Sequence, residues 1–342
     1  MLSPGMHLQR IGDRRSAETR LSRVRRTAFE NAARRRRHAR SARYRAGRPS
    51  RARLSDLFEI VPNISEGRDP GVVAACAAAA ERAGARVVHT TSDAAHNRSV
   101  LTAIGTGDAL VDAALAIAHI AVERIDLRRH RGEHPRIGAL DVLPFVPLGT
   151  ATIAAAVALA ERAAMRLWDE LAVPSYLYGA AARVPARENL ADVRRGEFEA
   201  LTTRNADPAD RPDIGVNAHA SAGASAVGAR AFLIAFNVEL ATGDLRVAAR
   251  IARMMRGRDG GLRTLKALAI RLDDERVQVS FNLTDVDAIP LYRITELVRG
   301  LAANEGVAVR RSELIGLAPR RAISQTAAYY LGISTETVRP IS

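Results

Sequence analysis

The segment 86–105, RVVHTTSDAAHNRSVLTAIG, decides the fold class of this chain. Two runs within it, Arg86–Thr91 and Arg98–Gly105, read as β-strands, and the polar stretch Ser92–Asn97 joins them. Two strands joined by a short turn pair as an antiparallel hairpin, whereas parallel strands need a long crossover connection. The segment therefore predicts a mixed or antiparallel sheet and disfavours an all-parallel, doubly wound fold.

The elements around this hairpin follow the order β-α-β-β-α-β, which is the split βαβ or ferredoxin-like order. A further helix and a short strand come after them. In chain order, the expected elements outside the hairpin are a strand at Leu57–Pro62, a helix at Asp69–Ala83, a helix at Asp108–Arg124, a strand at Leu140–Leu148, a helix at Thr152–Leu171 and a strand at Tyr176–Tyr178.

The same order recurs after a polar connector at Glu188–Gly215. We therefore predict an α+β protein with two ferredoxin-like subdomains, at residues 56–228 and 229–342, and a ligand cleft between them. The second set consists of strands at Ala231–Leu240, Leu265–Leu272, Val277–Leu283 and Val307–Leu317 and helices at Asp244–Met255 and Leu291–Asn304, followed by a terminal helix at Pro319–Leu331.

The positive charge of the chain is concentrated at its N-terminus. The formal net charge is +14, and residues 1–55 hold 17 arginines against three acidic residues, so the rest of the chain is neutral. A basic chain is typical of nucleic-acid-binding proteins, but here that pattern describes only the leader. We predict a disordered basic extension at residues 1–55, with a nucleic-acid-binding arm and an organellar transit peptide as alternatives.

Residue types exclude several classes of protein. The single cysteine, Cys76, excludes an intramolecular disulfide and a cysteine-based zinc site. No apolar run reaches the ~18–20 residues of a membrane span. No His-Glu-x-x-His, Gly-x-Ser-x-Gly or Gly-x-Gly-x-x-Gly motif is present. We expect a cytoplasmic protein that binds neither a metal nor a membrane.

The stretch 131–141, RGEHPRIGALD, carries the densest group of reactive side chains. A histidine can take and return protons near neutral pH, so His134 is the candidate acid–base residue. Arg136 and Asp141 are close enough in sequence to influence its charge state and to orient it, and Arg136 can hold a carboxylate through two hydrogen bonds. The alternative is a cluster of ion pairs among Glu133, Arg136 and Asp141 without a chemical role.

The other histidines of the neutral part allow weaker interpretations. His96 and His219 lie in turns and fit either a structural turn or a ligand contact. His119 lies on an apolar helix and reads as a core residue, whereas His130 neighbours three arginines and reads as solvated.

Eight short blocks stand in order along the neutral part of the chain. Together they resemble the formiminotransferase family, from about Glu59 to Pro319. The blocks are VPNISEG (61–67), NRSV (97–100), GEHPRIGALDV (132–142), YLYG (176–179), RRGEFE (194–199), GARAFLIAFN (228–237), VSFNLTD (279–285) and SELIGL (312–317).

The resemblance implies transfer of a formimino group from N-formimino-L-glutamate to N5 of tetrahydrofolate in histidine degradation. The products are L-glutamate and 5-formiminotetrahydrofolate, with tetrahydrofolate as a co-substrate and no metal. The resemblance also implies a homodimer, and a separate cyclodeaminase, because no cyclodeaminase domain follows in this sequence. The alternatives are a related enzyme with another donor, such as formiminoglycine, and a nucleic-acid-associated protein acting through residues 1–55.

The resemblance also assigns residues. It places the catalytic histidine at His134, where the imidazole would take the N5 proton and return it to the departing nitrogen. An acidic residue expected near His89 or Thr91 is missing, and Asp93 is the nearest acid. The residues expected to support catalysis or bind substrate are Arg136, Asp141, Arg98, Asn97, Asp93 and Asn63. The residues expected to bind folate are Gly215, Val216, Asn217, Ala218, His219, Ala220, Ser221, Ala222 and Gly223.

Overall fold

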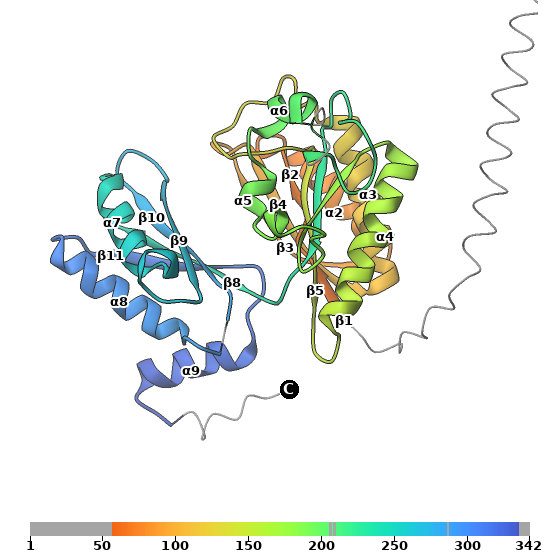
Figure 1. Cartoon of the computed structure of the whole chain (residues 1–342). Coiled ribbons are helices and arrows are strands. Elements are labelled where there is room, and N and C mark those ends of the chain that lie inside the picture. The colour runs from red at the N-terminus through yellow and green to blue at the C-terminus, as the bar shows by residue number, and fades with distance from the viewer. Residues whose placement is uncertain (1–56, 205–206, 208–209, 286, 335–342) are drawn as a thin grey trace, which may run out of the picture. The chain divides into compact units, whose positions relative to one another are not determined.

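The computed structural model describes residues 57–204, 207, 210–285 and 287–334. It contains two separate β-sheets with their own helices, and this confirms the predicted α+β class (Figure 1). We call residues 57–229 the first sheet unit and residues 234–331 the second sheet unit, and we describe each by itself. The predicted basic extension at residues 1–55 lies outside the described residues.

The first sheet unit begins with the predicted β-α-β-β-α-β order and continues beyond it. The hairpin of β3 and β4 pairs from Arg86 opposite Ile104 to Asp93 opposite Arg98, with a shift of register between Val87 and His89, and this confirms the antiparallel pairing that the opening segment predicts. The elements are β1 (Leu57–Ile60), β2 (Asn63–Ile64), α2 (Pro70–Arg82), β3 (Arg86–Asp93), β4 (Arg98–Thr106), α3 (Gly107–Arg124), β5 (Leu140–Pro147), α4 (Ile153–Leu171), β6 (Ser175–Gly179) and β7 (Ser225–Ala229).

The first sheet is antiparallel on one side and parallel on the other. Its strands lie in the order β3-β4-β1/β2-β5-β7-β6, with β1 and β2 sharing one position between β4 and β5. Pro62 separates β1 from β2, because proline has no N–H group to donate to a ladder. The strands β7 and β6 extend the sheet in parallel beside β5.

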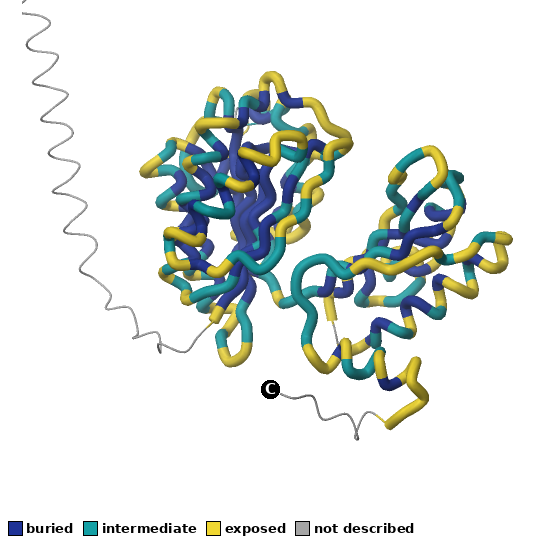
Figure 2. The backbone as a smooth tube through the Cα atoms, turned by 180° about the vertical axis from the view of Figure 1, so that it is seen from behind, coloured by how far each residue is buried: buried dark blue, intermediate teal, exposed yellow. Residues whose placement is uncertain are grey.

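Two hydrophobic layers cover the first sheet. The helices α2, α3 and α4 pack on one face over alanine-rich surfaces, and the central strands of the sheet are buried (Figures 1 and 2). On the other face, α5 (Leu190–Val193) and α6 (Glu197–Arg204) cover the side of β5, β7 and β6 around Tyr176 and Tyr178.

The first sheet unit differs from the sequence prediction at three places. The connector at Glu188–Gly215 contains α5 and α6, and β7 was not expected. The short alanine- and glycine-rich β7 lacks an alternating pattern because both of its faces are buried. His119 is exposed on the outer side of α3, since the buried face of that helix consists of aliphatic residues.

The second sheet unit repeats the same element order. In both units the four strands of the β-α-β-β-α-β block lie in the order fourth, first, third, second, and all neighbours are antiparallel. The elements are β8 (Ile234–Leu240), α7 (Leu245–Met255), β9 (Leu265–Arg271), β10 (Val277–Leu283), α8 (Leu291–Asn304), β11 (Val309–Ile315) and α9 (Arg320–Leu331).

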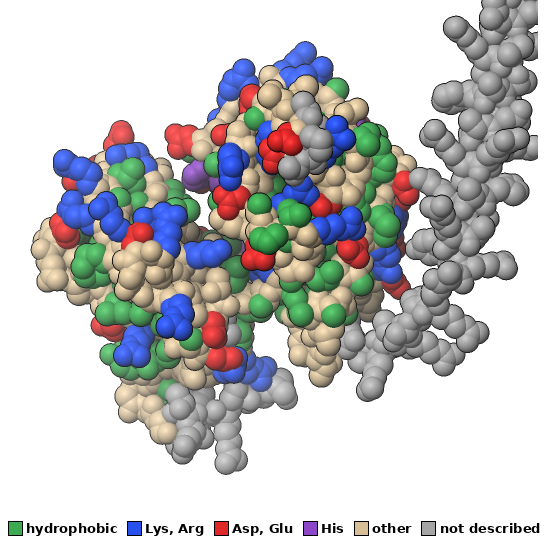
Figure 3. Space-filling view, in the orientation of Figure 1, with side chains coloured by type: hydrophobic (Ala, Val, Ile, Leu, Met, Phe, Trp, Pro, Cys, Tyr) green, Lys and Arg blue, Asp and Glu red, His purple; other side chains and the backbone are tan. Residues whose placement is uncertain are grey.

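The surface agrees with a neutral folded part. Positive and negative side chains are interspersed over the described residues on the face in view (Figure 3). Across those residues, none of the helices has the length and apolar character needed to cross a membrane.

Candidate active site

His134 lies in the loop that leads into β5, and both of its ring nitrogens are engaged. Arg98, the first residue of β4, donates a hydrogen bond from Nη1 to His134 Nε2. The Pro135 carbonyl oxygen lies 2.7 Å from His134 Nδ1. A guanidinium can only donate and a carbonyl can only accept, so the ring is the neutral tautomer with its proton on Nδ1. The lone pair of Nε2 is directed at Arg98.

The charges around His134 keep it neutral. Burial, together with the positive charges of Arg98 and Arg194, lowers the pKa of His134 to about 3, against a smaller opposing effect of Asp141. Burial and the charge of Arg194 also lower the pKa of Arg98 to about 10. His134 is therefore surrounded by positive charge before any substrate arrives.

Asp141 forms the acidic part of this cluster. It is 1 % exposed, its Oδ2 is ion-paired with Arg194 Nη2, and its Oδ1 accepts a hydrogen bond of 2.8 Å from the Ile137 backbone N–H. We expected Asp141 to orient His134 or to influence its charge state. The contacts of Asp141 are with Arg194 and with the backbone three residues after His134, so it acts on the imidazole through charge.

Arg136 points to a different set of partners from Arg98. Its guanidinium lies 2.7 Å and 2.9 Å from the two carboxylate oxygens of Glu199, and 2.6 Å from Glu197 Oε2. Its Nε donates to His130 Nδ1 at 3.3 Å. The expected role of Arg136 in holding a substrate carboxylate stays a prediction, and it requires these contacts to be exchanged.

Hydrogen bonds of Asn97 connect three loops at the end of the first sheet where His134 lies. Its Oδ1 accepts from Gly67 N at 3.0 Å, its Nδ2 donates to the Arg131 carbonyl at 3.1 Å, and its own carbonyl lies 2.9 Å from His130 Nε2. His130 is 7 % exposed, so the prediction of a solvated side chain is wrong. Its neighbours in sequence turn outward, while Asn97 and Arg136 hold it inside.

A second histidine lies beside His134. The rings of His96 and His134 meet edge to face with 6.0 Å between their centroids. The Asp93 carboxylate accepts a hydrogen bond of 2.8 Å from the His96 backbone N–H. Its other oxygen lies 2.8 Å from His96 Nδ1. Burial raises the pKa of the Asp93 carboxyl, but the hydrogen bonds from His96 outweigh it and hold this pKa below its usual range. His96 thus lies in a turn and also beside His134, so both interpretations of this residue stay predictions.

Asn63 lies within the sheet, in β2. It pairs with Val100 of β4 and Val142 of β5, and its Nδ2 donates to the Val61 carbonyl at 2.6 Å. Its expected role in substrate binding stays a prediction.

The stretch Gly215–Gly223 contains a hydrogen-bonded turn, and its last residue contacts the segment that leads into β5. His219 and Gly223 exchange backbone hydrogen bonds of 2.8 Å and 2.9 Å. Gly223 has φ of +70°, and a Cβ there would lie 2.1 Å from the Ile137 carbonyl oxygen, so this position requires glycine. Val216, Asn217 and Ala220 are exposed. Folate binding by this stretch stays a prediction.

Two residues of the site were not expected. Arg194 follows α5 and reaches Asp141 from 53 positions further along the chain. Tyr178 of β6 is buried within range of the charges of Arg194, Asp141 and Arg98, and burial raises the pKa of its hydroxyl. Both belong to sequence blocks that carry the family resemblance, and that signal could have found them.

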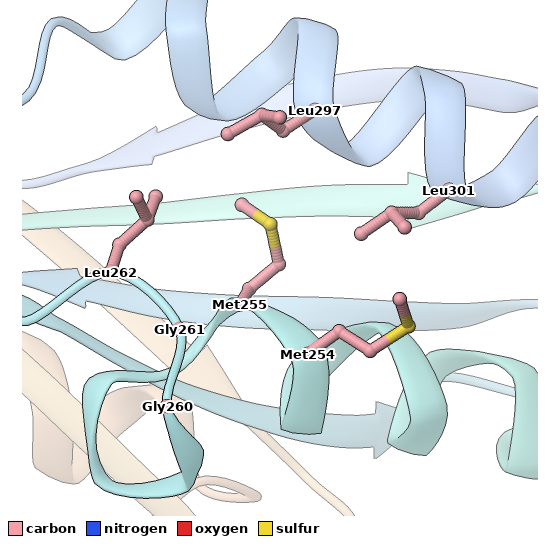
Figure 4. Close-up of a pocket in the computed structure, with 7 residues that line it drawn as sticks. All are labelled: Met254, Met255, Gly260, Gly261, Leu262, Leu297 and Leu301. Atoms are coloured by element: carbon pink, nitrogen blue, oxygen red, sulfur yellow. The ribbon is translucent and has the colours of Figure 1, made fainter.

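A separate pocket lies in the second sheet unit, at the end of α7 (Figure 4). It has a volume of about 380 Å³, and its lining carries no ionisable side chain. It is therefore unsuited to acid–base chemistry. The lining residues are Met254, Met255, Gly260, Gly261, Leu262, Leu297 and Leu301.

Comparison with models of known families confirms the resemblance that the eight sequence blocks indicate. Residues 57–230 match the N-terminal subdomain of the formiminotransferase domain, and residues 235–339 match the formiminotransferase domain model that follows it. Because the two matches span most of the sequence, the chain belongs to the formiminotransferase family, a family of one-carbon transferases.

Some similar relatives match this chain over nearly their whole length, and others match it over about half of their length. A glutamate formimidoyltransferase of Streptococcus pyogenes is 40 % identical over 283 residues, which cover 82 % of this chain and 95 % of the relative. One of Thermoplasma acidophilum is 43 % identical over 282 residues, which cover 81 % and 93 %. The formimidoyltransferase-cyclodeaminase of Gallus gallus is 40 % identical over 286 residues, which cover 81 % of this chain and 53 % of that protein.

Proposed function

We propose that this protein transfers the formimino group of N-formimino-L-glutamate to N5 of tetrahydrofolate and releases L-glutamate. The observation that carries the proposal is the neutral imidazole of His134, held on both nitrogens beside two partly buried arginines. Glutamate formimidoyltransferases that match this chain over more than nine-tenths of their length support the choice of substrates.

The transfer needs one proton to move. The N5 nitrogen attacks the formimino carbon and forms the new C–N bond, while the electrons of the C=N bond move onto the imino nitrogen. The tetrahedral intermediate then expels the glutamate nitrogen, and the C=N bond forms again. The N5 proton that is lost equals the proton that the departing nitrogen gains, so the reaction needs no external acid or oxidant.

His134 is the residue that moves this proton in the proposal. Its Nε2 carries a lone pair, which becomes available when Arg98 turns to the substrate. A positioned general acid–base group contributes about 10²–10⁴-fold to a rate. Holding both substrates together contributes to the rate as well. In this scheme the stretch Gly215–Gly223 binds tetrahydrofolate.

Other predictions about the protein's surroundings stand as proposals. They are a homodimer, a cytoplasmic location, a separate cyclodeaminase that consumes the product, and a division into subdomains between residues 228 and 229 with the substrates in a cleft. A nucleic-acid-binding role would depend on residues 1–55, which lie outside the described residues.

A donor panel tests the proposed function. The purified full chain is mixed with tetrahydrofolate and either N-formimino-L-glutamate or formiminoglycine, and release of the free amino acid is measured. We expect release from N-formimino-L-glutamate that depends on tetrahydrofolate, with a kcat/KM well above that for formiminoglycine. Faster transfer from formiminoglycine would assign the other donor, and release without tetrahydrofolate would indicate a hydrolase.

A further inference from the structure

The cluster around His134 contains more positive than negative charge. Arg98 and Arg194 each carry a positive charge, and Asp141 supplies the negative one. His134 is uncharged near neutral pH because burial and the charges of Arg98 and Arg194 lower its pKa, and Tyr178 is uncharged because burial raises its pKa. One positive charge is therefore left uncompensated in a largely buried position, which is costly without an anion.

The two guanidinium groups also keep unused hydrogen-bond donors. The Nε atoms of Arg98 and Arg194 are buried, and neither has a hydrogen-bond partner. The Arg194 side chain is only 10 % exposed. Buried donors are almost always satisfied in folded proteins, so two orphaned N–H groups in one cluster indicate a group that is supplied by a ligand.

Arg136, which lies in the same loop as His134, differs from the Arg98–Arg194 pair. Its guanidinium is paired with two carboxylates, and its Nε has a partner in His130. The charge of Arg136 is therefore balanced by this protein itself, whereas the charge of the Arg98–Arg194 pair is not.

We propose that the Arg98–Arg194 pair binds the α-carboxylate of the formimino donor directly beside His134. The proposal rests on the proposed function, and it adds the group of the donor that is recognised and the residues that recognise it. A guanidinium forms its strongest hydrogen bonds with carboxylates, often through two parallel N–H donors.

Substrate geometry selects the α-carboxylate among the carboxylates that are present. The nitrogen that loses the formimino group is bonded to the same carbon as the α-carboxylate, so the two are separated by two bonds. The γ-carboxylate lies further along the side chain. The carboxylates of tetrahydrofolate lie at the opposite end of that molecule from N5. A carboxylate site in contact with the acid–base residue therefore fits the α-carboxylate.

Binding at this pair also prepares His134 for proton transfer. A carboxylate on Arg98 competes with His134 Nε2 for the guanidinium, and it adds a negative charge beside the ring. Both changes favour the imidazolium form, so the pKa of His134 rises when the donor binds. The charged and titratable groups that face His134 are Arg98, Arg194, Asp141 and His96.

A cycle of enzyme and substrate changes tests the contact. We compare the Arg98→Gln variant with the wild type, using N-formimino-L-glutamate and its analogue without the α-carboxylate, N-formimino-4-aminobutyrate. Each single change should lower kcat/KM by about 10–100-fold, since hydrogen bonds to charged groups are worth that much. Both changes together should cost little more than either alone. Independent, multiplying losses would overturn the proposal.

Matched variants separate this result from a folding defect. Arg86→Gln alters an exposed arginine of the same hairpin and should leave both substrates unaffected. Arg98→Lys keeps the charge and should recover part of the loss. Arg98 is the better position for substitution, because removing Arg194 would leave Asp141 buried without its ion-pair partner.

A second measurement does not depend on turnover. The ring protons of His134 are followed by NMR against pH in the full chain, with and without L-glutamate as the probe, and the His134→Gln variant assigns the signal. We expect the pKa of His134 to rise by one unit or more in the wild type and to be insensitive to L-glutamate in Arg98→Gln. An unchanged pKa at saturating L-glutamate would refute the coupling. A shift without any formimino transfer would refute the proposed function but leave the site in place.

Discussion

The two sheet units share one strand order but differ in what they bury. In the described part of the second sheet unit, the buried polar or charged residues are Glu239 and Thr295. In the first sheet unit such residues are far more numerous, and many of them lie at one end of the sheet. They are Glu59, Asn63, Ser65, Asn97, Ser99, Thr102, His130, Arg136, Asp141, Ser175, Arg187 and Ser225.

The acidic residues Asp141 and Glu239 illustrate this difference between the two units in buried charge. The buried Glu239 of β8 meets Arg276, Arg310 and Arg311, whose side chains are a third to two-thirds exposed. Asp141 meets Arg194, which is 10 % exposed. Water can screen the charges around Glu239, but it screens those around Asp141 much less. In the proposed function, the shared fold supplies the frame, and the buried charge of the first unit supplies the chemistry.

The largest expected effect follows from removing the acid–base group. The His134→Gln variant should lower kcat by about 10²–10⁴-fold, because the proton of N5 then has no positioned acceptor. Steady-state release of L-glutamate measures the loss. The matched control His119→Gln changes an exposed histidine of α3 and should keep wild-type turnover. A His134→Gln enzyme within a few-fold of the wild type would break the link between the buried charge and the chemistry.

The second largest expected effect is a loss of stability when the charge of Asp141 is removed. Asp141→Asn should lower the free energy of unfolding by about 3–5 kcal/mol, since it leaves Arg194 as a buried charge without its partner. Urea denaturation followed by circular dichroism measures the change. A loss below 1 kcal/mol would mean that water reaches this ion pair.

The pH dependence of stability should also report the site. His134 has a pKa of about 3 in the folded chain, below its ordinary value, so the unfolded state binds more protons in the acidic range. Stability is then fully present above the unfolded pKa and falls as the pH drops below about 6.5. The midpoint of urea unfolding should fall more steeply from pH 6.5 to pH 4 in the wild type than in His134→Gln. Equal slopes would contradict the low pKa.

The smallest effect is expected in the second sheet unit. Glu239→Gln should cost about 1 kcal/mol or less, because its arginine partners are partly solvated and exposed ion pairs contribute little. Turnover should not change. A loss as large as that of Asp141→Asn would remove the contrast between the two units.

The sequence predicted the order of most helices and strands along the chain, because the hairpins carry local signals. A polar turn between two short apolar runs marks β3 and β4, and Asp69 and Pro70 mark the start of α2, where Asp69 accepts from the Gly71 N–H at 2.8 Å. The strand β7 carries no such signal, since a short run buried on both faces has no alternation. Its place in the sheet depends on parallel pairing with β5 and β6.

The site was predicted in part for the same physical reason. His134, Arg98 and Asp93 stand in local polar blocks at strand ends, and the structure brings all three of these blocks together. The partners that decide their charges come from far along the chain. Arg194 pairs with Asp141, and Glu199 pairs with Arg136, and both Arg194 and Glu199 lie in the polar connector. Local patterns cannot show which of two arginines is left without a carboxylate.

Direct observation of the transferred carbon tests the proposed function most directly. N-formimino-L-glutamate labelled with ¹³C in the formimino group is incubated with tetrahydrofolate and the full chain, and the carbon signal is followed by NMR. The account predicts that the label moves from the glutamate nitrogen to N5 of tetrahydrofolate with wild-type protein and stays on glutamate on the same timescale with His134→Gln. A label that stays on glutamate with the wild type, or that is released as a free one-carbon compound, would contradict it.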